Sequence, residues 1–100
     1  MSEQKDISEG KLMALPLAIW MPGEPPSVYH GSPEEMVASM AREMGEDMTV
    51  RETVDRLCAA LAAYRHVVIG LPEDVEDDTL ARLFVFALLD MKLARPLAAA

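Results

Sequence analysis

Cysteine is nearly absent from this chain of 100 residues, because Cys58 is the single one. No disulfide can therefore form within the chain. Cys58 falls on the apolar stripe of an expected helix, where a thiol usually behaves as a small buried hydrophobe. That use of a lone thiol fits a reducing compartment, so we expect a cytoplasmic protein.

Positive charge is also scarce. The sequence has 9 Lys and Arg residues against 17 Asp and Glu residues, which gives a formal net charge of −8. The basic residues are scattered along the chain, whereas binding to nucleic acid needs a clustered positive face. We therefore expect no nucleic-acid partner. Mimicry of nucleic acid by the carboxylates is a weaker option, since their order suggests no regular stripe.

Long hydrophobic runs are missing. The longest, residues 12–21, is half the length of about 20 residues that a membrane span requires. The polar residues before it include Glu3, Asp6 and Glu9, which do not suit the positive start of a signal peptide. We expect no membrane partner, a disordered tail over 1–10, a single domain over 11–97 and a frayed end over 98–100.

The motifs that carry chemistry are absent as well. Tyr29, His30 and Ser32 lie close together, but no Gly-x-Ser-x-Gly elbow surrounds the serine. The soft metal ligands are His30, Cys58 and His66, and none stands at a zinc-site spacing. No glycine-rich phosphate loop is present. The sequence predicts a protein that is not an enzyme, with no catalytic residue, metal or cofactor.

What the sequence does contain begins with a predicted hairpin. Residues 11–21 are apolar, residues 21–26 hold three prolines and a glycine, and residues 27–30 are rich in strand formers. Two strands joined by such a loop predict a β-hairpin. Pro16 has no N–H for the ladder, so the first strand should lie at an edge or be broken there.

A capping box predicts the first helix. Ser32 can accept a hydrogen bond from the Glu35 amide while the Glu35 side chain returns one, and a proline follows the serine directly. Gly45 ends this helix. A second capping box at 49–52 opens a helix that runs to about residue 65, with apolar residues at helical spacing.

The rest of the chain completes the expected fold. Residues 66–71 are β-branched and closed by a proline, which predicts a buried third strand. An acidic turn leads to a third helix from about residue 78 to 92. The order strand, strand, helix, helix, strand, helix predicts a small α+β domain with three helices on one face of a three-stranded sheet.

The third helix suggests a partner surface. It has a core face and a second apolar stripe, formed by Val85, Phe86, Leu89 and Leu93. A domain of this size has little other chain with which to cover both sides of one helix. The leading hypothesis is therefore a protein-interaction module, an adaptor or accessory subunit, that self-associates as a homodimer through this stripe.

A pocket is the alternative. Methionine is abundant, with eight residues, and flexible thioethers suit either an irregular core or an adaptable binding surface. The alternative hypothesis is a domain that binds a small molecule or a peptide between sheet and helices. Its possible pocket is lined by Trp20, Tyr29, Met36, Met40 and Met44.

Overall fold

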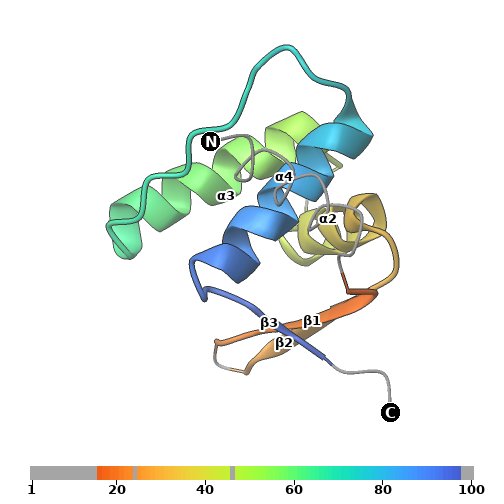
Figure 1. Cartoon of the computed structure of the whole chain (residues 1–100), viewed down its shortest axis with the longest axis vertical. Helices are drawn as coiled ribbons and strands as arrows, with labels where there is room; N and C mark the ends of the chain where they lie inside the picture. The colour runs from red at the N-terminus through yellow and green to blue at the C-terminus, as the bar shows by residue number, and fades with distance from the viewer. Residues whose placement is uncertain (1–15, 24, 46, 98–100) are drawn as a thin grey trace, which may run out of the picture.

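The computed structural model describes residues 16–23, 25–45 and 47–97. Its elements are β1 (Ala18–Met21), β2 (Ser27–His30), α2 (Pro33–Glu43), α3 (Val50–Tyr64), α4 (Asp77–Asp90) and β3 (Arg95–Pro96). The three helices lie on one side of the sheet (Figure 1). The predicted small α+β domain is thus confirmed. The predicted tail, the frayed end and residues 11–15 of the first strand lie outside the described residues.

The predicted hairpin is present, and it forms the main part of the sheet. The strands are antiparallel in the order β2-β1-β3, and Ile19 stands opposite Tyr29. Both side chains are buried, because this face of the sheet meets the helices. β1 starts two residues after Pro16, so the proline lies outside the ladder and β1 can be the central strand.

Both capping boxes are confirmed. The Ser32 hydroxyl accepts a hydrogen bond from the Glu35 amide at 3.2 Å, and the Glu35 carboxylate accepts one from the Ser32 amide at 2.8 Å. Thr49 and Glu52 make the same two bonds at 3.1 and 3.0 Å. These bonds satisfy amides that a helix start would otherwise leave without partners.

The third strand is not where the sequence predicts it, and this corrects the predicted element order. Residues 66–72, which we call the strap, have no regular secondary structure and pair with no strand in the described part of the chain. The third strand is β3, which pairs with β1 through Arg95 opposite Trp20.

Backbone turns explain this difference. His66, with φ of 58°, ends α3 in the left-handed region and sends the strap away from the sheet. Lys92, with φ of 61°, ends α4 in the same way, and the amides of Leu93 and Ala94 both donate to the Leu88 carbonyl. This turn delivers β3 to the free edge of β1.

The second apolar stripe of the last helix is largely covered by the chain itself. Val85 is fully buried and Leu93 is nearly so, whereas Phe86 and Leu89 are half-buried. This corrects the prediction that all four residues form an exposed contact surface. The strap is part of the reason, because its alternate apolar side chains pack against the same core as α4. A helix that is apolar on every side is here the central helix of one small core.

Candidate functional site

The candidate site exists because α3 is fully buried only near its start, at Thr53 and Val54. Val54 is fully buried, whereas Leu57 and Leu61, one and two turns further along the same stripe, are only half-buried. Tyr64, at the end of the stripe, is 82% exposed. Leu57 and Leu61 contact the edge of the core, and the rest of the apolar face in the second half of α3 borders an open space.

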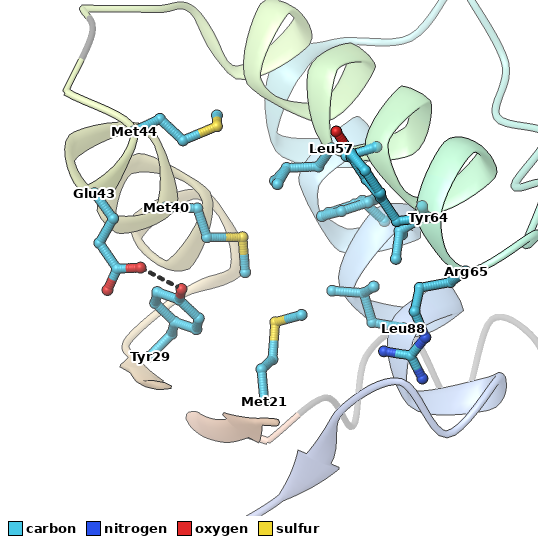
Figure 2. Close-up of a pocket in the computed structure, with 12 residues that line it drawn as sticks. Met21, Tyr29, Met40, Glu43, Met44, Leu57, Tyr64, Arg65 and Leu88 are labelled. Carbon is cyan, nitrogen blue, oxygen red and sulfur yellow. Dashed lines mark hydrogen bonds between the residues drawn. The ribbon is translucent and has the colours of Figure 1, made fainter. Parts of the chain in front are cut away.

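That space is a pocket of about 390 Å³. One wall is the last turn of α2 with Met40, Glu43 and Met44, and the other is the second half of α3 (Figure 2). Figure 2 shows Met21 and Tyr29 entering from the hairpin and Leu88 from α4. The full lining is Met21, Tyr29, Met40, Glu43, Met44, Leu57, Ala60, Leu61, Tyr64, Arg65, Phe84 and Leu88.

Polar groups are few and lie on opposite walls. The Tyr29 hydroxyl donates a hydrogen bond of 2.7 Å to the Glu43 carboxylate on the α2 wall. Burial raises the pKa of Tyr29, and the bond to Glu43 raises it further, so the hydroxyl keeps its proton. Arg65 extends from the α3 wall. An occupant would meet an apolar interior with a carboxylate on one side and a guanidinium on the other.

The structure brings together three of the five residues that the sequence predicts for a pocket. Tyr29, Met40 and Met44 line it. Met36 lies one turn before Met40 and is fully buried in the core. The prediction of Trp20 is also wrong, because Trp20 alternates with Ile19 along β1 and so faces the side of the sheet away from the helices. There, the Arg95 guanidinium lies 5.3 Å from the centre of its ring.

The sequence reasoning missed the α3 wall. Leu57, Leu61 and Tyr64 belong to a helical stripe, and helical spacing alone assigns such a stripe to the core. One signal was available. Ala60 is a small residue on the pocket side of α3, and it leaves space that a larger side chain would fill.

The polar residues before α2 do not form a site together. Tyr29 points to the core, whereas His30 is exposed on the other face of the sheet. The Ser32 hydroxyl is engaged by the Glu35 amide. Each of the three groups is thus separated from the others by strand alternation or by its capping role.

Among the described residues, no three His, Cys, Asp or Glu side chains gather as a metal site would require. Within the same ranges, no helix has the length and apolar character needed to cross a bilayer. No protein-family model, no curated protein and no solved structure matches the chain.

Proposed function

We propose that the chain is a non-catalytic protein-interaction module that takes an apolar helical segment of a partner protein into the pocket between α2 and α3. The observation that carries this proposal is the open, methionine-lined space beneath the second half of α3. Grooves between helices commonly receive the apolar face of an amphipathic helix. Methionines suit such a groove, because unbranched thioethers adjust to different apolar surfaces.

Charge favours a basic partner segment. Glu43 stands at the α2 wall, and a second hollow nearby is lined by Asp47, Glu52 and Asp55 together with Met48 and Arg56. The whole chain has a formal net charge of −8, so a basic segment is also attracted at long range. A Lys or Arg beside the apolar residues of the partner would reach Glu43.

Cys58 favours a structural role and a reducing compartment, which supports a cytoplasmic location for this module. The thiol is half-buried and free. Burial raises its pKa, and the Asp55 carboxylate raises it further, so the reactive thiolate is disfavoured.

Methionine methyl groups provide the test. With carbon-13 in the methionine methyls, the full-length chain is titrated with a short amphipathic helix of leucine and lysine, and its leucine–glutamate counterpart serves as the charge control. We expect the signals of Met21, Met40 and Met44 to shift with the basic peptide. The buried Met36 and the exposed Met91, which lie outside the pocket, should not move.

A matched pair of variants locates the binding. Ala60 and Ala62 are both exposed on α3, but only Ala60 lines the pocket. Ala60→Trp should block the opening and abolish the shifts, whereas Ala62→Trp should bind like the native chain. Shifts of Met91 equal to those of Met40, or binding that survives Ala60→Trp, would contradict the proposal.

A small molecule is the second candidate occupant. The volume of about 390 Å³ lies within the range of typical ligand pockets, roughly 300–1,000 Å³. Arg65 could pair with an acidic group on such a ligand. Decanoate is a suitable probe: pocket methyl shifts with decanoate but with neither peptide would favour this candidate over a partner helix.

A further inference from the structure

The strap has the character of a β-strand but no sheet to join. Its exposed residues alternate with half-buried ones: Val67, Ile69 and Leu71 pack against the core, whereas Val68 is 79% exposed. This period of two is that of a strand with one covered face. Its β-branched sequence, which predicts a strand, agrees with that geometry.

The backbone of the strap is largely without partners. Within the described part of the chain, its one backbone–backbone hydrogen bond runs from the Val67 amide to the Leu61 carbonyl of α3, at 3.2 Å. Because amides alternate sides along an extended chain, the N–H and C=O groups of Val68 and Gly70 point away from α3. Unpaired groups of this kind are a template for strand addition.

The charges at the two ends of the strap select the partner. Arg65 and His66 stand at its start, and Glu73 and Asp74 follow its end. An antiparallel pair of identical straps brings the basic end of each copy to the acidic end of the other. A parallel pair would instead place like charges together, which is unfavourable.

We propose that the strap is a dimerisation strand, which pairs antiparallel with the strap of a second copy around a two-fold axis at Ile69. Val68 of each copy lies opposite Gly70 of the other and exchanges both backbone hydrogen bonds with it. Gly70 has no atom within 4 Å of the position of a Cβ, so the neighbouring strand has room there. The basic residues before each strap, Arg65 and His66, then come near the acidic residues Glu73 and Asp74 of the other copy.

This pairing is closed, because a two-fold axis uses the same strand on both copies and leaves no strap edge for a third. The helical core beneath the strap supports this pairing, because two paired strands gain stability when one of their faces packs against a helix. One pair of short strands is a limited contact, so we expect a reversible dimer whose fraction rises with concentration. The strap lies outside the pocket between α2 and α3, although Arg65 before its start also lines that pocket.

Sedimentation of the full chain over a range of concentrations tests the proposal. We expect a monomer–dimer equilibrium for the native chain. Val68→Pro removes two of the four central backbone bonds without touching the core, and it should weaken dimerisation by about tenfold or more. Leu17→Lys, at an equally exposed apolar residue elsewhere, should dimerise like the native chain. Circular dichroism should show the same fold for all three.

A charge swap tests the orientation. Glu73→Arg alone should weaken the dimer, and adding Arg65→Glu to it should restore the native dimer strength. Cross-linking tests the register in a Cys58→Ala background: Ile69→Cys should oxidise to a covalent dimer faster than Val68→Cys, although Val68 is the more exposed residue. The proposal is overturned by a native chain that stays monomeric at every concentration, by unchanged dimerisation of Val68→Pro, or by faster cross-linking at residue 68.

Discussion

At the scale of a single residue, Tyr29 belongs both to the core and to the pocket wall. Its ring is buried opposite Ile19, and its hydroxyl donates to Glu43 at the pocket wall. A buried hydroxyl that loses its partner costs more free energy than a solvated one. The bond to Glu43 therefore stabilises the end of α2 against the hairpin as well as the pocket wall.

The raised pKa of Tyr29 predicts a loss of stability at high pH. Burial and Glu43 hold the folded-state pKa above the ordinary value of 10.0, so the unfolded chain releases this proton first. The contribution of the protonated hydroxyl is complete below pH 10 and is lost as the pH rises through the folded-state pKa. Tyr29→Phe should cost about 1 kcal/mol at neutral pH, and the difference from the native chain should shrink above pH 10.

Urea unfolding of the native chain and of Tyr29→Phe at a series of pH values measures this difference. Both proteins also carry Tyr64→Phe, so that Tyr29 is the only tyrosine that differs between them. A constant gap between the two unfolding free energies across the alkaline range would show that the proton of Tyr29 is not coupled to folding.

At the scale of an element, the capping box of α2 predicts an acid-sensitive helix start. Hydrogen bonds from the Ser32 amide and hydroxyl hold the pKa of Glu35 below its ordinary value of 4.5. A lowered folded-state pKa contributes stability above pH 4.5, and that stability is lost as the pH falls through the folded-state value. The thermal midpoint of the native chain should therefore exceed that of Glu35→Gln at neutral pH, and the two should converge in acid.

Glu34→Gln is the matched control, because Glu34 occupies the same first turn but lies outside the capping box. It should lower the midpoint less than Glu35→Gln at neutral pH. Equal effects of the two substitutions would assign the stabilisation to the helix dipole rather than to the capping bonds.

The sequence predicts elements well where a local device defines them. Ser32 and Thr49 are followed by glutamates three residues later, and both helices start where those capping boxes place them. The position of the third strand depends instead on two left-handed residues, His66 and Lys92, and neither is a glycine that would signal such a turn. The strap shows the same limit: its composition predicts a strand, but composition does not say which strand it pairs with.

The candidate site was predictable in part for the same reason. Met40 and Met44 share a helix face, so the α2 wall follows from spacing. The α3 wall does not follow from spacing, because a helical stripe that borders an open pocket has the same sequence pattern as a stripe that faces a core. Val85 and Leu93 show the converse: both are buried in a core to which residues far away in the sequence, such as Ile19 and the strap, also contribute.

At the scale of the whole molecule, one helix separates the two proposed contact surfaces. The apolar stripe of α3 faces the pocket, while the strap starts at its end and is bonded to its Leu61 carbonyl. An occupant that holds the second half of α3 in place would also order the start of the strap. The two contacts can therefore influence each other through α3 and through Arg65, which belongs to both.

A pair of truncations separates folding from binding in this small molecule. Phe84 forms part of the pocket lining and is fully buried in the core, whereas Tyr64 lines the same pocket and is 82% exposed. Phe84→Ala should cost about 3–5 kcal/mol through lost burial and a cavity. That is a large share of the roughly 5–15 kcal/mol that stabilises a typical domain.

Tyr64→Ala should change the unfolding free energy by no more than about 0.5 kcal/mol, as is usual for an exposed position. It should nonetheless weaken binding of the leucine–lysine peptide, because it removes part of the α3 wall. Urea unfolding gives the first quantity and the methionine methyl titration the second. If Tyr64→Ala destabilised the chain as much as Phe84→Ala, the second half of α3 would be closed onto the core in solution, and no open pocket would remain for a partner to enter.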